Sequence, residues 1–377
     1  MLWVCLGTGL RGLGAVALVA QDTQATQDTR HTQSKQGAQD THDTQDTQHA
    51  QATQDGDVPT YHAYANLVQV PALVLDQERK PMAPISEGRF YVSLDGGPKF
   101  RVTHARLEDD DPISLAVVLD LSQPFPDLIR RIDVVLAGLA PVSLHAADRV
   151  SVYSMDCDLV RSAARVPAEA ATLKRAVDLA LQAWNERGRT RRKGDCREGL
   201  GLWDSLTVAV KALSEGPGRR VILVVTNGVD RGSKTPWNVL RDYAQEQGVA
   251  IFGVVQAGDM NPAFRTGSGN RENLFNGLCE LTGGMVIVSS QGNLAADLKR
   301  FTALIRGRYI VEFPHPVDTV GGQHGMDITI GKSDAFIRPA GAAVPVDNPA
   351  ILKDPMTISS DPSHAPQLGK RKVLTPN

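Results

Sequence analysis

The sequence predicts an α/β protein with a doubly wound, mostly parallel sheet, preceded by a short antiparallel β unit. From Pro112 onward, apolar strands alternate with helical segments, and three of these strands are almost unbroken apolar runs. Apolar strands that lack a polar alternation are typical of parallel sheets covered by helices on both faces. The predicted strands are Ile113–Leu121, Arg149–Met155, residues 219–228, residues 248–256 and Met285–Val288.

The segments between these strands have the apolar spacing of helices. The predicted helices are Phe125–Leu139, Ala168–Trp184, Leu202–Leu213, a helix opened by Thr235-Pro236, Arg271–Leu281 and Asn293–Ile305. Thr235 is a suitable N-cap, Pro236 is suited to a first helical position, and Gly248 is suited to a helix end. Apart from the consecutive helices Ala168–Trp184 and Leu202–Leu213, helices and strands alternate, which supports the doubly wound prediction.

A different pattern flanks this region. Residues 61–107 alternate apolar and polar side chains around Gly96-Gly97-Pro98, which predicts a small antiparallel β unit with a hairpin-like turn. After an α/β domain at 112–307, the runs RYIVEFP and GMDITI predict a β return at 308–340. We expect residues 341–377, which are rich in Pro, Asp and Ser towards the end, to form an extended tail.

The N-terminal residues predict an exported protein. Residues 1–20 are rich in apolar and small side chains and predict a signal peptide. A miscalled start codon is the alternative, because no Lys or Arg precedes the apolar run and Arg11 interrupts it. Residues 21–57 contain no Val, Ile, Leu, Met or aromatic residue, which predicts a disordered Gln/Asp/Thr-rich tether. We expect a secreted or cell-envelope location.

Composition excludes some classes of partner. The formal net charge of −2 provides no global field for nucleic acid or an acidic membrane. No apolar run reaches the ~18 residues that a transmembrane helix needs. The chain also lacks a Gly-x-Gly-x-x-Gly segment after its first strand and a Gly-x-Ser-x-Gly elbow.

The informative polar residues come at the ends of predicted strands. In an open α/β sheet, ligands bind beyond the carboxyl ends of the strands. Asp120 and Ser122 follow the first strand of this region, Asn227 follows the RRVILVV strand, and residues 198–204 precede a helix. We therefore expect the functional edge of the sheet at these positions.

Several segments, taken in order, resemble the von Willebrand factor A-related family of bacterial, often acidobacterial, proteins. AVVLDLSQP stands where the family has Asp-x-Ser-x-Ser, GLGLWDSL where it has Gly-Thr-Ala-Leu-Tyr-Asp-Ala-Leu, and VVTNGVD where it has Thr-Asp-Gly-x-Asp. A β lead-in, LTGGMVIV and GRYIVEF complete a resemblance that covers roughly residues 61–340. It implies a sheet with one antiparallel edge strand and a binding module rather than an enzyme.

The resemblance also implies a metal-ion-dependent adhesion site, which this chain matches incompletely. Asp120 and Ser122 match, whereas Pro124 replaces the second serine, Leu200 replaces the threonine and Asn227 replaces the second aspartate. Mg2+ requires about six oxygen ligands in near-octahedral geometry. We therefore predict a degenerate remnant without cofactor, in which Asp120 and Ser122 serve as hydrogen-bonding residues, and keep a Mg2+ site with a reduced ligand set as the alternative.

A basic segment, residues 187–198, lies close to this edge in the predicted topology. It has five basic residues between Arg187 and Lys193. Three interpretations stay open: a solvated loop, a cation that compensates Asp120, or a surface that binds anions. The candidate residues of this binding rim are Arg191, Arg192, Lys193, Arg197 and Asp204.

The chain has four cysteines, of which Cys5 would leave with the signal peptide. A disulfide between Cys157 and Cys196 would pin the basic segment in an exported protein. The alternative is two unlinked thiols, and Cys279 is expected to be a small core residue.

The predicted function is that of an exported, metal-independent, non-catalytic module that binds an unknown protein. A metal-dependent adhesion domain is the alternative, and an enzyme of unknown class is a remote one.

Overall fold

A computed structural model describes the chain in eleven stretches. They are residues 62–64, 67–82, 84–109, 111–122, 128–190, 200–230, 232–256, 274–314, 320–341, 343–344 and 357–359. No helix within these stretches is long and apolar enough to cross a membrane. The predicted signal peptide (1–20) and tether (21–57) lie outside the described residues.

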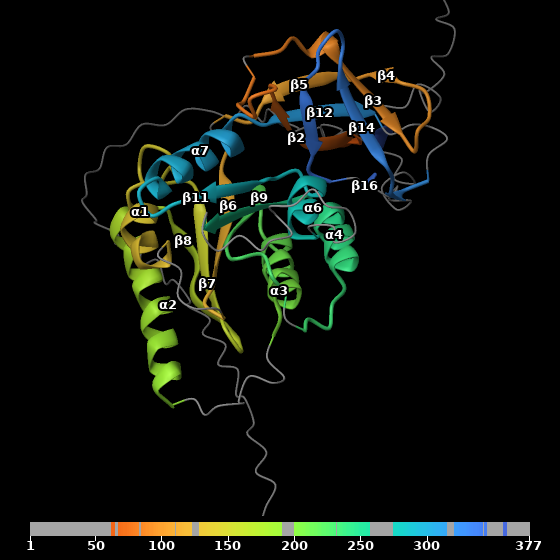
Figure 1. The fold of residues 1–377 in the computed structure, drawn as a ribbon. Coiled ribbons are helices and arrows are strands. Elements are labelled where there is room, and N and C mark those ends of the chain that lie inside the picture. Colours follow the sequence, from red (N-terminus) through yellow and green to blue (C-terminus); the bar gives the residue numbers. More distant parts are fainter. Residues whose placement is uncertain are drawn as a thin grey trace, which may run out of the picture. The chain divides into compact units, whose positions relative to one another are not determined.

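The central sheet has six strands in the order β11-β10-β9-β6-β7-β8 (Figure 1). The strands are β6 (Ile113–Asp120), β7 (Arg149–Met155), β8 (Leu159–Pro167), β9 (Arg219–Val225), β10 (Val249–Gln256) and β11 (Val286–Ser289). All neighbours are parallel except β8, which pairs antiparallel with β7 at one edge. The predicted fold class is confirmed. Apolar spacing alone missed β8, because Arg161, Ser162 and Arg165 interrupt it.

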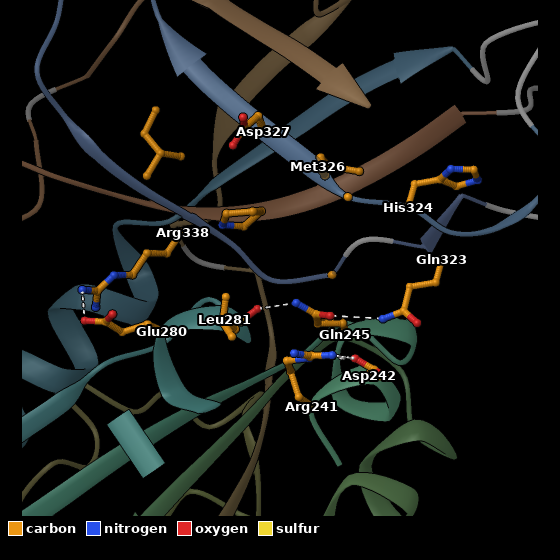
Figure 2. Close-up of a pocket in the computed structure, with 14 residues that line it drawn as sticks. Arg241, Asp242, Gln245, Glu280, Leu281, Gln323, His324, Met326, Asp327 and Arg338 are labelled. Carbon is orange, nitrogen blue, oxygen red and sulfur yellow. Dashed lines mark hydrogen bonds and ion pairs between the residues drawn. The ribbon is translucent and has the colours of Figure 1, made fainter. Parts of the chain in front are cut away.

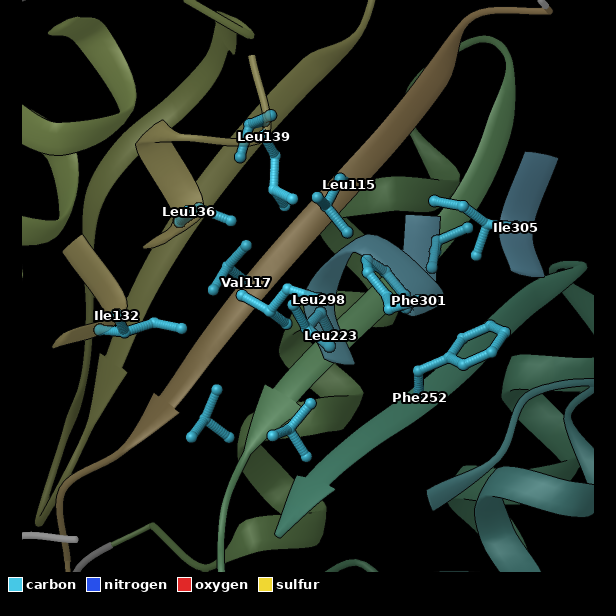
Figure 3. Close-up of a cluster of buried hydrophobic side chains, with 14 of the residues drawn as sticks. Leu115, Val117, Ile132, Leu136, Leu139, Leu223, Phe252, Leu298, Phe301 and Ile305 are labelled. Carbon is cyan, nitrogen blue, oxygen red and sulfur yellow. The ribbon is translucent and has the colours of Figure 1, made fainter. Parts of the chain in front are cut away.

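Helices cover both faces of this sheet. One layer contains α1 (Ile132–Ala137), α2 (Ala170–Thr190) and α7 (Leu294–Arg306), and the other contains α3 (Leu202–Ser214), α4 (Trp237–Glu246) and α6 (Leu274–Leu281). Leu115 and Val117 of β6 point into the first core, where they meet side chains of α1 and α7 (Figure 3). Ala116 and Val118 belong to the second core. Because successive side chains of β6 alternate between two buried faces, the strand is apolar without interruption from Leu115 to Leu119.

Seven other strands form a β-sandwich from two distant parts of the chain. Its four-stranded sheet has the order β15-β2-β12-β5 and its three-stranded sheet the order β14-β3-β4. The strands are β2 (Leu67–Leu75), β3 (Phe90–Leu94), β4 (Phe100–Arg101), β5 (His104–Leu107), β12 (Tyr309–Pro314), β14 (Met326–Ile330) and β15 (Phe336–Pro339). β2 pairs with β12, so the α/β domain is inserted between β5 and β12. The segments 61–107 and 308–340, which sequence analysis treated separately, thus contribute to the same sheets.

Strand β2 belongs to two cores at once. Val70 and Val74 pack in the sandwich with Phe90 and Val311, whereas Leu73 and Leu75 point into the core that α1, α2 and α7 cover. Fully burying a valine or leucine side chain stabilises a fold by about 1.5–3 kcal/mol. The sandwich and the inserted domain are therefore joined by continuous apolar packing.

A buried ion cluster lies where the chain enters and leaves the inserted domain. The Glu108 carboxylate accepts hydrogen bonds from Arg219 Nη1 at 3.1 Å and Arg308 Nε at 2.8 Å, and its side chain is fully buried. The Glu108 backbone N–H also donates to the Arg308 carbonyl at 2.9 Å. Burial lowers the pKa of Arg219, and the charge of Glu108 opposes this effect. The two connecting segments are thus held side by side.

Helix boundaries differ locally from those predicted. The expected helix over Phe125–Leu139 is a 3-10 turn, η2 (Ile129–Arg131), followed by the short α1, with residues 123–127 outside the described part. Thr235 does not cap α4: Pro236 occupies the N-cap position, and no side-chain hydrogen bond comes from it. Gly248 does have the left-handed φ of +61° expected after a helix.

Four further short strands and one turn complete the description. β1 (His62–Tyr64) pairs parallel with β17 (Thr357–Ser359), and β13 (Gly322–Gln323) pairs antiparallel with β16 (Ala343–Val344). The 3-10 turn η1 (Glu87–Arg89) precedes β3. The segment predicted as an extended tail therefore contributes β16 and β17.

Candidate functional site

The candidate site lies at the carboxyl edge of the central sheet, where β6 and β9 end side by side. Leu119 pairs with Val225 in the parallel register, so the next residues, Asp120 and Thr226, emerge at the same level. Asp120 is 1% exposed and Thr226 is 3% exposed. The topology therefore brings two strand ends together at a buried carboxylate.

Both oxygens of the Asp120 carboxylate accept hydrogen bonds from neighbouring side chains. Oδ1 accepts from Ser122 Oγ at 2.6 Å and from the Ser122 backbone N–H at 3.1 Å. Oδ2 accepts from Thr226 Oγ1 at 2.6 Å, and that hydroxyl in turn accepts from the Gly228 N–H at 3.0 Å. Sequence analysis placed Asp120, Ser122 and residues 226–228 at strand ends, but it assigned Asn227 rather than Thr226 to the site remnant. Its position at the end of a strand neighbouring β6 is the signal that could have identified it.

Asn227 does not join this cluster through its side-chain oxygen. Oδ1 accepts from the Val229 N–H at 3.0 Å, which closes a turn within its own loop. Leu200, at the position where the resembling family has threonine, is 39% exposed, and its N–H donates to the Cys157 carbonyl at 2.8 Å. Pro124 lies outside the described residues. Asn227 thus follows Thr226 at the end of β9, but its side-chain oxygen accepts a hydrogen bond within its own loop.

The candidate oxygen donors for a cation at this edge are Asp120, Ser122, Thr226 and Asn227. Each of them makes hydrogen bonds to another of these residues or to the backbone. No group of three or more His, Cys, Asp or Glu side chains able to hold a metal ion occurs in the described part of the chain. Mg2+ would need several oxygens directed at one point. In the described residues, the hydrogen bond between Thr226 and Asp120 instead links the ends of β9 and β6.

A second polar cluster closes the N-terminus of α3. The first helical N–H groups have no partner within the helix, and Gly201 at the N-cap position has no side chain to supply one. Ser233 Oγ accepts from the N–H groups of Trp203 at 3.0 Å and Asp204 at 3.2 Å, and Asp230 Oδ1 accepts from Trp203 at 3.3 Å. The loop after β9 therefore caps α3 from outside the helix.

Glycine is required at position 201 because the loop after β9 lies very close to the start of α3. A Cβ atom at this position would overlap Ser233 Oγ and lie 2.5 Å from the Ser233 backbone nitrogen and 2.7 Å from Asp230 Oδ1. Two of these atoms belong to groups that cap α3. Only glycine therefore allows the loop and the helix start to approach this closely.

Asp204, a predicted rim residue, has an internal role. Its carboxylate accepts from the backbone N–H of Lys234 at 2.9 Å and of Thr235 at 2.8 Å. Burial raises the pKa of Asp204, but hydrogen bonds from Lys234, Thr235 and Gly201 outweigh that effect and lower it overall. Asp204 thus ties α3 to the segment that leads into α4.

The basic segment begins beside a second buried carboxylate. Arg187 Nε lies 3.3 Å from Asp156 Oδ2, and the Asp156 side chain is 1% exposed. Asp156 Oδ1 also accepts from the Cys157 N–H at 2.6 Å. Among the described residues, Arg187 forms an ion pair with Asp156. The candidate residues Arg191, Arg192, Lys193, Cys196 and Arg197 lie outside the described residues.

The two described cysteines differ in state. Cys157 is disulfide-bonded, although the other half of the bond lies outside the described residues. Cys279 is a buried free thiol on α6, as expected of a small core residue, and burial raises its pKa. Only Cys157 is therefore associated with the carboxyl edge, through the hydrogen bond of its carbonyl to Leu200.

No protein-family model and no curated protein matches the chain. A von Willebrand factor type A structure from Catenulispora acidiphila is 11% identical over 76% of this chain and 74% of that one, with a TM-score of 0.40. An aerotolerance-related membrane protein from Bacteroides fragilis is 14% identical over 51% of this chain and 98% of its own, with a TM-score of 0.35. Proximal thread matrix protein 1 from the mussel byssus is 10% identical over 52% of this chain, with a TM-score of 0.35, and the chain spans about half (49%) of its length.

The chain's own topology identifies its fold. Five parallel strands, one antiparallel edge strand, helices on both faces and the polar strand ends at Asp120 and Thr226 occur in the order that the sequence resemblance implies. The inserted domain has a von Willebrand factor A-like α/β fold.

Proposed function

We propose that this chain is a non-catalytic protein-interaction module of the von Willebrand factor A type that works without a metal ion. The observation that supports it is the use of both Asp120 oxygens by the hydroxyls of Ser122 and Thr226, each at 2.6 Å. A cation at this point would have to displace these hydrogen bonds, while Asn227 offers no second carboxylate. The alternative is a metal-dependent adhesion domain with a reduced ligand set.

Calorimetric titration of the full chain with Mg2+ and with Mn2+ separates the two functions. We expect no saturable heat for the wild type. Asp120→Ala and Ser122→Ala should behave in the same way, with circular dichroism used to verify that they are folded. Asp178→Ala, which alters an exposed carboxylate on α2 paired with Lys174, is the matched control. Saturable binding that survives in Asp178→Ala and disappears in Ser122→Ala would establish the metal-dependent alternative.

The carboxyl edge is the surface that we assign to the protein partner. Asp204 uses both carboxylate oxygens internally, so we assign direct contact to Arg191, Arg192, Lys193 and Arg197 instead. Replacing these four residues by serine should abolish capture of a partner from the envelope fraction of the native organism, with or without EDTA. The matched control replaces four basic residues away from this edge, Lys80, Arg101, Arg106 and Lys332. Equal capture by both variants would contradict this assignment.

We also propose that the chain is exported and that Cys196 is the partner of Cys157. Disulfides persist mainly in oxidising compartments, so the bonded state of Cys157 supports export. The Leu200 N–H lies 2.8 Å from the Cys157 carbonyl, and four residues of chain reach about 13–14 Å, so Cys196 is within range. Peptide mapping without reductant should yield a linked Cys157–Cys196 peptide. Two unlinked peptides, or a link to Cys5, would contradict the pairing.

An enzyme remains the least supported alternative. The hydroxyl of Ser122 donates to Asp120, but the described residues show no histidine or lysine next to it that could act as a base. We therefore expect no hydrolytic turnover of ester or peptide substrates. An activity that Ser122→Ala removes, while the fold is retained, would reverse this assignment.

A further inference from the structure

A pocket of about 580 Å³ lies between the inserted domain and the sandwich, far along the chain from Asp120 (Figure 2). One wall comes from α4 and α6, with Gln245 and Leu281. The opposite wall comes from the loop that leads into β14 and from β15, with Gln323, His324 and Arg338. The pocket is therefore lined by two structural units whose contacts determine its shape.

Side-chain contacts join the two walls at both ends of the pocket. Gln323 Nε2 donates to Gln245 Oε1 at 3.1 Å, and Gln245 Nε2 donates to the Leu281 carbonyl at 2.7 Å. At the other end, Arg338 Nη2 lies 2.6 Å from Glu280 Oε1. Gln323, the last residue of β13, thus contacts α4 directly, and the 320–325 loop includes this short strand. Anything that changes the conformation of this loop should change the wall of the pocket.

His324, next to Gln323, has an acceptor opposite each ring nitrogen. Nδ1 lies 2.7 Å from Asp95 Oδ2, in the turn between β3 and β4, and Nε2 lies 2.6 Å from the Val320 carbonyl oxygen. The imidazole is 15% exposed. A neutral imidazole has one N–H and can satisfy only one of two acceptors, whereas an imidazolium satisfies both. A protonated ring would therefore satisfy both acceptors at these distances.

We propose that His324 is a pH-sensitive latch, whose protonated ring fastens the 320–325 loop to the β3–β4 turn and so holds the wall of this pocket in place. Two further contacts join the same loop and turn: the Gly325 N–H donates to Asp95 Oδ1 at 2.8 Å, and the Asp95 N–H donates to the Gly325 carbonyl at 2.7 Å. When the ring loses a proton, a nitrogen lone pair faces either the carboxylate or the carbonyl. The ring then loses either its hydrogen bond to the Asp95 carboxylate in the turn or its hydrogen bond to the Val320 carbonyl within the loop.

The charges around the latch are consistent with this role. Asp95 is the charged group in contact with the ring, and its hydrogen bond raises the pKa of His324. The same bond lowers the pKa of Asp95. The other charged groups that line the pocket are Arg241, Asp242, Glu280, Arg338 and Asp327. Arg241 is paired with Asp242 and Arg338 with Glu280, so four of these five charges are compensated locally.

The direction of the pH effect follows from the two shifts. Because the folded pKa of His324 is raised, its contribution to stability is complete below the unfolded value of about 6.5 and is lost as the pH rises through the folded value. Asp95 has a lowered folded pKa, so its contribution is lost only as the pH falls below about 3.9 towards that lower value. Both hydrogen bonds of the His324 ring are therefore made in mildly acidic solution, and one of them is lost as the pH rises above the folded pKa of His324.

Hydrogen exchange of the full chain at about pH 5.5 and about pH 8.5, corrected for intrinsic exchange rates, tests this proposal. We expect amides of residues 320–325 to lose protection at the higher pH, because the deprotonated ring keeps only one of its two hydrogen bonds. His324→Gln should remove the pH dependence. The matched control is His104→Gln, because His104 has a single, exposed carboxylate neighbour, Glu87, at 3.7 Å.

A second variant and a second measurement keep the test decisive if His324→Gln folds poorly. Asp95→Asn retains an acceptor for the Gly325 N–H and removes the charge, so the His324 titration observed by NMR should move to lower pH. Protection that is equal at the two pH values in the wild type would overturn the proposal. A His324 titration that is unchanged in Asp95→Asn would overturn it as well.

Discussion

Replacing Glu108 by Gln should destabilise the protein strongly, because this substitution removes a buried charge and leaves the shape of the side chain almost unchanged. Glu108 is the carboxylate shared by Arg219 and Arg308, whose side chains are 6% and 1% exposed. The amide oxygen of Gln can still accept one hydrogen bond. What is lost is the negative charge that balances two desolvated guanidinium groups.

The expected magnitude follows from this burial. Removing one partner of a buried ion pair costs about 3–5 kcal/mol, because the remaining charge is left in a medium of low polarisability. Arg219 keeps hydrogen bonds to the carbonyl oxygens of Asp109 and Ile305, which limit the loss. We therefore expect the free energy of unfolding to fall by about 3–5 kcal/mol, a large part of the about 5–15 kcal/mol typical of a folded protein.

Urea denaturation at neutral pH, followed by circular dichroism, measures this change. The matched control is Glu78→Gln, because Glu78 also pairs with a cation, Lys80 at 3.1 Å, but its side chain is 73% exposed. Surface substitutions of this kind change stability by no more than about 0.5 kcal/mol. A loss below about 1 kcal/mol in Glu108→Gln would refute the view that the cluster depends on this charge.

Two further predictions concern the closure of α3. Gly201→Ala should lower the free energy of unfolding by about 1–3 kcal/mol, since the loop at Ser233 must move. The control is Gly188→Ala within α2, whose added Cβ meets no atom within 4 Å and which should stabilise the protein by about 0.5–1 kcal/mol. Thermal denaturation of the two variants measures both effects, and equal effects would contradict the argument that the loop approaches Gly201 closely. Asp204→Asn should cost about 1 kcal/mol at neutral pH, allowing for partial exposure. Because the pKa of Asp204 is lowered, this difference should shrink as the pH falls from about 4 towards the folded value, and urea titrations at several pH values that gave a constant difference would disprove it.

The apolar and polar pattern of a sequence cannot predict contacts between residues that are distant along the chain. Asp120 could be identified from sequence because it ends an apolar strand, but its bond to Thr226 depends on the parallel register of β6 and β9. Likewise, Gly201 has no local feature that distinguishes it. Its importance comes from a loop about thirty residues away along the chain, as the Ser233 contacts show.

Local apolar spacing is enough to predict the α/β class, most of the helices and strands in their order, and the position of the polar strand ends, because it reports which faces of an element are buried. The pairing of β2 with β12, the edge strand β8 and the contact of Glu108 with two buried arginines became apparent only in the folded protein. The physical reason is that spacing shows that a face must be covered but not by which segment. The choice among distant partners depends on strand register and on the pairing of buried charges, which exist only once the chain has folded.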